Sequence, residues 1–275
     1  MKKISKTVLA FLIFGYAFLY VPIVLLMVNS FSASEIPGIW TTFSFKWFYK
    51  VLEDEDILYA AITSLEIASI SATGAVCLGI LSATATKNPG KFRGKKFLDS
   101  VIIMPVVMPE IILGFSLLML FMAAESLLGL PKERGLMTVA IGHIMASVAY
   151  VHMTVRTRMM SLDSSLEEAA LSLGAKPFTV FTQIKVPIIA KSILAGWLLA
   201  FTLSLDDLVI ASFLSGPGST TLPILIFSNV RIGVTPMINA FATIFIVLIA
   251  LCIFLAFLIT SKKKNSQKEQ VTNQN

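Results

Sequence analysis

Residues 167–187 read EEAALSLGAKPFTVFTQIKVP and lie between two strongly apolar stretches of the chain. The first seven of these residues favour a helix, and Gly174 should end it, because glycine enters the left-handed conformation of a helix end without steric cost. Pro177 suits the first turn of a second helix, where its missing N–H is not needed, and Pro187 is expected to stop that helix. The stretch therefore predicts a helix–turn–helix at a membrane surface that carries two carboxylates and is suited to docking.

The composition of the chain indicates a membrane protein. Of its 275 residues, 56% are hydrophobic and only 14% are charged, which excludes an ordinary soluble domain. A helix needs about 20 apolar residues to cross a hydrocarbon core ~30 Å thick, and six stretches are long enough. We therefore predict an all-α integral membrane fold, with residues 1–275 as a single transmembrane domain and residues 261–275 as a disordered tail. The six expected spans are residues 7–29, 57–86, 97–124, 136–155, 188–214 and 236–260.

The positive charges predict an orientation in the membrane. Most of the 22 Lys and Arg residues lie in alternate loops and near the two ends of the chain. The positive-inside rule then places both termini, and the loop of residues 156–187, in the cytoplasm. The net charge of +6 is thus interpreted as an orientation signal and not as a nucleic-acid surface. The apolar run after the basic N-terminus is too long for a cleaved signal peptide, so it is predicted to be a retained first span.

Four carboxylates fall inside the predicted spans, where each costs at least ~2.5–3.5 kcal/mol and is a functional candidate. The rise of a helix places all of them in the middle or outer half of the membrane, so they could form one acidic level. We take them as candidate residues of a substrate pathway, together with the aromatic side chains of Trp197 and Phe201. Two alternatives stay open: the aspartates could lie at the outer interface, where ionisation is cheap, and the glutamates could pair with a neighbouring subunit. The four carboxylates belong to Glu66, Glu110, Asp206 and Asp207.

The two adjacent aspartates should differ in role. Successive residues of a helix point ~100° apart, so Asp206 and Asp207 cannot both face one pathway. We expect one of them to face the pathway while the other packs or caps, and we favour Asp206 for the pathway. In the third span, Pro105 and Pro109 should break the helix, which frees carbonyl groups that must be satisfied inside protein or in a wet cavity.

The sequence contains no motif typical of catalysis or metal binding. There is no GxxxxGK[ST] phosphate loop, so the chain is not expected to hydrolyse ATP itself, and GxSxG and HExxH are absent too. His143 and His152 share no metal-ligand spacing and are expected to be buried with their hydrogen bonds satisfied. Cys77 and Cys252 lie inside apolar runs and are expected to be buried thiols, not a disulfide. The chain is therefore predicted to be neither an enzyme nor a metal-binding protein.

The loop of residues 156–187 resembles a known coupling element. The pattern EAA, three residues, Gly, nine residues, then I-x-x-P is similar to the EAA loop of importer-type ABC transporter permeases, with Val186 where leucine is usual. An ordinary helical hairpin is the alternative, but the full spacing favours the EAA loop. The resemblance implies a type I ABC importer transmembrane domain, whose loop seats in a cleft of a cytoplasmic ATPase subunit. The implied coupling residues are Glu167, Glu168, Ala169, Ala170, Gly174, Ile184 and Pro187.

Four further stretches narrow the resemblance to the polyamine importer permeases, nearest to the putrescine-type member. This resemblance implies an ATP-driven polyamine importer in the bacterial inner membrane, in which the multi-pass chain forms half of the translocation pathway. The implied partners are a second permease subunit, two cytoplasmic ATPase subunits that use the ATP, and an extracytoplasmic polyamine-binding protein; no cofactor is expected on this chain. The stretches are LYVPIVLLMVNSFSAS (19–34), MPVVMPEIILGFSLLMLF (104–121), GWLLAFTLSLDDLVIASFLSGPGSTTLP (196–223) and SNVRIGVTPMINAFAT (228–243).

Other functions stay open at this point. An ABC permease for an amino acid, a sugar or iron would carry the same loop, although a sugar permease has no reason to keep four intramembrane carboxylates. A proton-coupled secondary transporter would use the carboxylates and His143 as relays, and its uptake would survive loss of the ATPase. An integral-membrane enzyme is disfavoured, because the sequence offers no pairing of nucleophile and base and no metal-ligand set.

Overall fold

The computed structural model describes residues 5–87, 94–233, 235–247 and 250. The chain divides into two compact units, residues 1–55 with 226–275 and residues 56–225, and each is described by itself. Among the described residues, extended structure is limited to one isolated antiparallel bridge between Ser32 and Phe43. The predicted all-α fold is confirmed.

Within the described part of the chain, five helices are long and apolar enough to cross a membrane. They are Lys6–Asn29, Glu55–Lys87, Glu110–Leu128, Leu136–Met160 and Pro177–Asp206. Of the predicted sixth span, Pro236–Val247 forms a shorter apolar helix. Residues 251–260 lie outside the described residues, as do Cys252 and the predicted tail.

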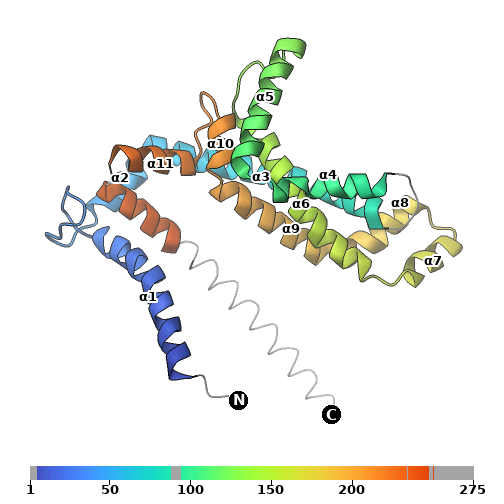
Figure 1. Cartoon of the computed structure of the whole chain (residues 1–275), viewed down its shortest axis with the longest axis horizontal. Helices are drawn as coiled ribbons and strands as arrows, with labels where there is room; N and C mark the ends of the chain where they lie inside the picture. The colour runs from blue at the N-terminus through green and yellow to red at the C-terminus, as the bar shows by residue number, and fades with distance from the viewer. Residues whose placement is uncertain (1–4, 88–93, 234, 248–249, 251–275) are drawn as a thin grey trace. The chain divides into compact units, whose positions relative to one another are not determined.

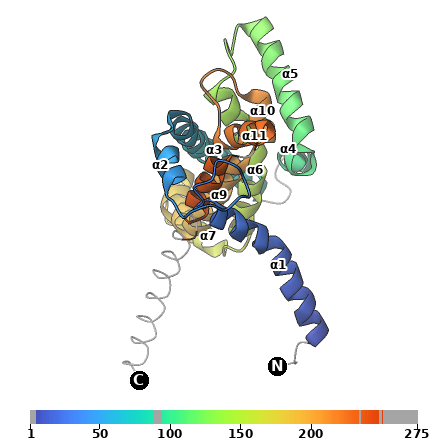
Figure 2. The ribbon, with the colours of Figure 1, turned by 90° about the vertical axis from the view of Figure 1, so that its left-hand side faces the viewer.

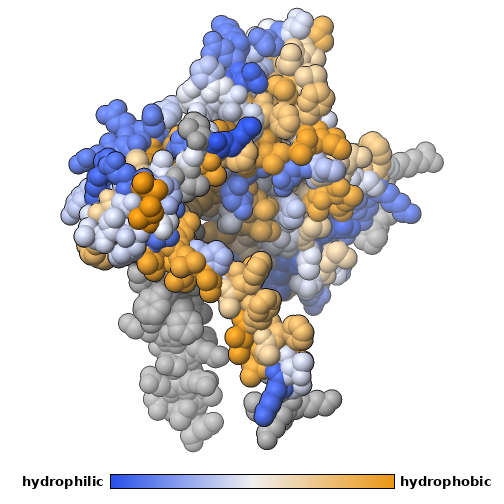
Figure 3. Space-filling model, turned by 60° about the vertical axis from the view of Figure 1, so that its left-hand side comes forward, coloured by the Kyte–Doolittle hydropathy of each residue, from blue (hydrophilic) through white to orange (hydrophobic). Residues whose placement is uncertain are grey.

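The first unit contains α1 (Lys6–Asn29), α2 (Lys46–Glu53) and most of α11 (Leu222–Ile232). No side chain of α1 is buried, and hydrophobic side chains cover the face of α1 seen in Figure 3. The indole Nε1 of Trp47 donates a hydrogen bond to the carbonyl oxygen of Ser32 at 2.9 Å. This contact ties α2 to the segment that follows α1.

In the second unit, α3 (Glu55–Lys87), α6 (Leu136–Met160) and α9 (Val186–Asp206) share one core. Small side chains dominate the contacts of α3, as is typical of helices that pack closely in membranes, and Val151 of α6 is fully buried between the helices. Figures 1 and 2 show α6 and α9 side by side. Cys77 of α3 is exposed, so the expectation of a buried thiol is wrong there.

Residues 97–124 do not form one continuous helix. They divide between α4 (Lys95–Val107) and α5 (Glu110–Leu128), which run in different directions in Figure 1. Pro109 makes this break as predicted, because a proline lacks the N–H that would continue the ladder and keeps the preceding Met108 extended, with ψ 137°. Pro105, in contrast, stays inside α4.

Residues 188–214 also contain a break, which we did not predict. The helix α9 ends at Asp206, and α10 (Val209–Leu214) begins after two residues. Asp207 has extended geometry, with φ −68° and ψ 124°, so the chain changes direction there. The two helix breaks lie close together, because α10 packs against both α5 and α6.

The expected helix–turn–helix is present as α7 (Ser165–Ser172) and α8 (Pro177–Thr179). Gly174 has φ +88°, the left-handed conformation that ends the first helix, and Pro177 occupies the first turn of the second. These two expectations are confirmed.

The expectation that Pro187 stops the second helix is wrong. The π-helical segment η1 (Val180–Lys185) leads directly from α8 into α9, and Pro187 lies in the first turn of α9. The Val186 N–H donates to the carbonyl oxygen of Phe181, five residues back. In an α-helix the ring of a proline clashes with the carbonyl group four residues before it. The wider π turn displaces that carbonyl group relative to Pro187, so the helix can continue.

Candidate functional site

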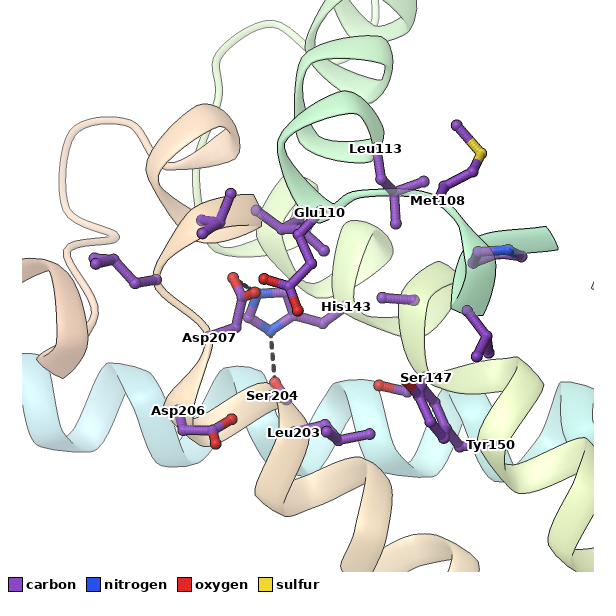
Figure 4. A pocket seen from close by; sticks show the side chains of 16 residues that line it. Met108, Glu110, Leu113, His143, Ser147, Tyr150, Leu203, Ser204, Asp206 and Asp207 are labelled. Atoms are coloured by element: carbon purple, nitrogen blue, oxygen red, sulfur yellow. Dashed lines mark hydrogen bonds and ion pairs between the residues drawn. The ribbon is translucent and has the colours of Figure 1, made fainter. Parts of the chain in front are cut away.

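A cavity of about 390 Å³ lies in the second unit, where the two helix breaks meet α6 (Figure 4). Its walls come from the end of α4, the start of α5, one face of α6, the end of α9 and the start of α10. Three of the four carboxylates that the sequence places in the membrane line it, those of Glu110, Asp206 and Asp207. The cavity is large enough for a small organic ligand.

The broken helices place these carboxylates. Glu110 is the first residue of α5, where the positive end of the helix dipole stabilises a negative charge. Asp207 accepts a hydrogen bond on Oδ1 from the Ala211 backbone N–H at 2.9 Å, and so caps the short helix α10. The carbonyl groups at the ends of α4 and α9 have no partner in their own helices and add partial negative charge.

His143 of α6 connects two elements of the cavity wall. Its Nδ1 lies 2.6 Å from Oγ of Ser204, and its Nε2 lies 3.2 Å from Oδ1 of Asp207. The Nε2 contact is an ion-pair distance without hydrogen-bond geometry, so the expectation of a fully satisfied histidine is met at one ring nitrogen only. Figure 4 shows the carboxylates of Glu110, at the start of α5, and Asp207, just after α9, next to each other beside this ring.

The two aspartates differ, as predicted. Asp207 caps α10 and contacts His143, and its side chain is only 10% exposed. Asp206 is exposed at the end of α9, and no other described side chain forms a hydrogen bond or ion pair with it. The carboxylate of Asp206 is therefore free to receive a ligand.

The remaining pathway candidates lie outside this cavity. Glu66 of α3 lines a separate, shallow hollow with Ile62 and Ser69. Trp197 and Phe201 of α9 stack with ring centroids 5.1 Å apart, and the indole N–H of Trp197 donates to Oγ1 of Thr73 at 3.2 Å. The structure thus brings three of the six candidate residues together, leaves Glu66 exposed on α3, and packs Trp197 and Phe201 partly buried against the core of α3, α6 and α9.

Sequence reasoning missed His143 as part of the acidic site. The signal is present on α6, where His143, Ser147 and Tyr150 follow one another at helical spacing and all line the cavity. A polar face on an otherwise apolar span indicates contact with water or a ligand. No group of three or more possible metal ligands occurs among the described residues.

In the loop of residues 156–187, the two glutamates have different surroundings. Lys185 donates to Glu167 Oε1 at 2.5 Å, and Lys87 at the end of α3 lies 3.6 Å from Oε2. Partial burial alone would raise the pKa of Glu167, but the hydrogen bond and the charges of both lysines outweigh it and hold the pKa below its usual value. Glu168 is exposed, as are Leu173 and Phe178. Glu167 therefore holds the loop together, and Glu168 is available for an outside contact.

Comparison with known proteins identifies relatives of the whole chain. Residues 75–262 match the family model described as "binding-protein-dependent transport system inner membrane component". The chain is 43% identical over 256 residues to the putrescine transport system permease protein PotI of Escherichia coli (strain K12), covering 93% of this chain and 91% of that protein. It is 39% identical over 248 residues to the spermidine/putrescine transport system permease protein PotC of the same strain, covering 90% and 91%.

Solved structures share the fold. A bacterial ABC transporter involved in the import of the acidic polysaccharide alginate matches with a TM-score of 0.71 and 19% identity, covering 94% of both chains. The methionine ABC transporter MetNI, in an inward-facing conformation, matches with a TM-score of 0.55 and 16% identity, covering 74% of this chain and 95% of the other. At these identities the likeness shows the fold alone.

Proposed function

The chain belongs to the family of binding-protein-dependent transport system inner membrane components, and from this premise we propose that it forms half of the pathway of an ATP-driven polyamine importer. It is a permease subunit of an ABC importer. The observation that supports a polyamine is the cavity, where three carboxylates surround one space at the helix breaks. The printed names of the relatives, a putrescine permease and a spermidine/putrescine permease, point to the same class of solute.

The chemistry of the cavity suits an alkylammonium ion. Putrescine and spermidine are apolar chains with ammonium groups, and the wall combines carboxylates with apolar side chains such as Leu113 and Leu203. The ammonium groups need compensation for the water they lose, which carboxylates and the carbonyl ends of α4 and α9 supply. A site of very high affinity would trap the cation, so conduction requires contacts that break again.

The three carboxylates of the cavity have different roles. Asp206, which is exposed and has no partner, receives an ammonium group first, and Glu110 provides a second negative charge across the cavity. Asp207 is held by His143 and Ala211 and shapes the wall. The exposed Glu66 and the partly buried rings of Trp197 and Phe201 extend the route along α3 and α9, and the second permease subunit completes it.

Transport is driven through the loop of residues 156–187. Its exposed surface, with Glu168, Leu173 and Phe178, seats on a cytoplasmic ATPase subunit, where Ala169, Ala170 and Ile184 complete the motif. ATP binds to the two ATPase subunits, and no cofactor binds to this chain. Closure of the ATPase pair moves the loop, the spans open outward, and an extracytoplasmic binding protein releases the polyamine into the cavity.

Uptake of radiolabelled putrescine and spermidine by the reconstituted importer tests this proposal. The importer contains both permeases, the ATPase subunits and the binding protein. We expect Asp206→Asn to lower uptake at least about tenfold, because a hydrogen bond to a charged group contributes about 1.5–3 kcal/mol. The matched control is Glu53→Gln, which neutralises an exposed carboxylate at the end of α2, outside the cavity, and should leave uptake unchanged.

Two results would contradict parts of the proposal. If the wild-type importer hydrolyses ATP but takes up neither polyamine, the substrate is a different solute. If uptake of either polyamine continues without the ATPase subunits, the chain works as a secondary transporter and the coupling role fails.

A further inference from the structure

A second cluster of charged side chains lies apart from the cavity. Asp99 of α4 places Oδ2 3.3 Å from Nη2 of Arg156 and Oδ1 3.7 Å from Nε2 of His152, both on α6. The other ring nitrogen of His152, Nδ1, lies 2.9 Å from Oγ of Ser82 on α3. Three helices therefore meet around one carboxylate.

His152 is buried, Asp99 and Arg156 are partly buried, and the cluster is incompletely hydrogen-bonded. The side chain of His152 is 0% exposed and that of Asp99 is 20% exposed. Asp99 Oδ1, His152 Nε2 and Arg156 Nε each lack a hydrogen-bond partner among the described residues. The charged contacts of Asp99 with Arg156 and His152 thus join α4 to α6.

The position of the cluster gives this pairing a consequence. The helix α4 has no buried side chain and packs chiefly against α6, so its contacts with Arg156 and His152 are important ties. Toward its C-terminal end, about 10 Å along the helix from Asp99, α4 forms the cavity wall at Pro105 and Val106. Arg156 lies one turn before the end of α6, which leads into α7.

We propose that Asp99 is a positioning residue that transmits the movement of the coupling loop to α4 and so to the wall of the cavity. Movement of the loop displaces the end of α6 with Arg156, and Asp99 follows because its carboxylate is paired there. The shift of α4 then changes the wall at Pro105 and Val106. This inference rests on the proposed coupling role of residues 156–187.

The test compares putrescine transported per ATP hydrolysed in the complete reconstituted importer, with wild type beside Asp99→Asn. We expect assembly and ATP hydrolysis to persist while the ratio falls at least about tenfold, the effect of losing one hydrogen bond to a charged group. Ser100→Ala is the matched control, because this exposed neighbour on α4 bonds only to the carbonyl oxygen of Lys96 in its own helix. An unchanged ratio in an assembled Asp99→Asn importer overturns the proposal.

A second pair of variants covers the case in which Asp99→Asn does not assemble. Arg156→Lys keeps the charge but loses the planar guanidinium, so it should also lower the ratio. The double variant Asp99→Asn/Arg156→Gln should be no worse than Asp99→Asn, because two residues that act as one contact are not additive. If none of these variants assembles, the cluster is structural and the proposal is wrong.

A conformational measurement separates this inference from the identity of the solute. Met108→Cys, in a background with Cys77 and Cys252 replaced by serine, places a thiol on the cavity wall. ATP should change the rate at which maleimide labels this thiol in the wild-type background and not with Asp99→Asn. Failure of polyamine uptake in wild type would then refute only the proposed substrate. A change in labelling rate with ATP that persists in Asp99→Asn would refute the proposed role of Asp99.

Discussion

Asp206 and Asp207 are neighbours in the chain, yet α9 ends between them, so their side chains have different surroundings. The carboxylate of Asp207 already serves the Ala211 N–H and lies beside His143, whereas that of Asp206 is exposed. A carboxylate with internal partners contributes to stability, and one without them is available to a ligand. Stability and uptake should therefore respond to different members of this pair.

At the residue scale, we expect Asp207→Ala to destabilise the protein by about 1–3 kcal/mol, because it removes a helix cap and leaves a buried His143 nitrogen without its counter-charge. Asp206→Ala should change the stability by no more than about 0.5 kcal/mol, as exposed substitutions usually do. Thermal unfolding of the solubilised importer measures both variants. Equal losses of stability, or a larger loss for Asp206→Ala, would show that the division of roles is mistaken.

At the scale of elements, two glycines face the same buried side chain from different helices. A Cβ on Gly79 of α3 would lie 2.6 Å from Cγ1 and 2.8 Å from Cβ of Val151, which is closer than real atoms approach. A Cβ on Gly196 of α9 would lie 3.2 Å from the same Cγ1, a tight contact that a small shift relieves. The close approach of α3 to α6 thus depends on a glycine more strongly than the close approach of α9 to α6 does.

Gly79→Ala should therefore destabilise the second unit by about 1–3 kcal/mol through overpacking. Gly196→Ala should come out near neutral, because alanine gains up to about 1 kcal/mol of helix propensity over glycine and offsets the tight contact. The midpoints of thermal unfolding of the two variants, measured side by side, check this order. A Gly79→Ala protein as stable as wild type would mean that α3 and α6 separate without cost.

At the scale of the whole molecule, the cavity and the loop of residues 156–187 lie toward opposite ends of α9. The loop presents Glu168 outward, whereas Glu167 is paired with Lys185 of the loop and Lys87 of α3. Loss of either glutamate should impair coupling, but for different reasons. The first should weaken the contact with the ATPase, and the second should loosen the loop itself.

We expect Glu168→Ala to weaken association with the ATPase subunits about tenfold, the effect of one lost hydrogen bond to a charged group, without loosening α7. Glu167→Ala should increase hydrogen exchange in α7, because it removes the ion pairs with Lys185 and Lys87. Co-purification of the ATPase and hydrogen exchange of the loop, applied to both variants, separate the two effects. If Glu168→Ala leaves ATPase association and uptake unchanged, the coupling role of the loop is wrong.

Local patterns predicted the elements that depend on local chemistry. The apolar stretches, the break at Pro109 and the helix end at Gly174 follow from residues within one or two turns. The end of α9 at Asp206 does not, because the contact of Asp207 with His143 on another helix forms only after the chain has folded. The predicted acidic level is a second example. Spacing along the spans predicts how deep each carboxylate lies in the membrane, but the direction in which a side chain such as Glu66 points depends on packing.

The π-helical segment Val180–Lys185 has a consequence for how such a subunit changes over evolutionary time. A π turn holds one residue more than the α-helical turn it replaces, and each residue turns the helix by about 100°. The extra residue of the π turn therefore sets the direction in which α7 and α8 point around the axis of α9. Loss or gain of one residue in this segment would rotate the exposed surface of α7 and α8 without changing any side chain in the membrane. A permease could in this way adapt to a different ATPase and keep its solute.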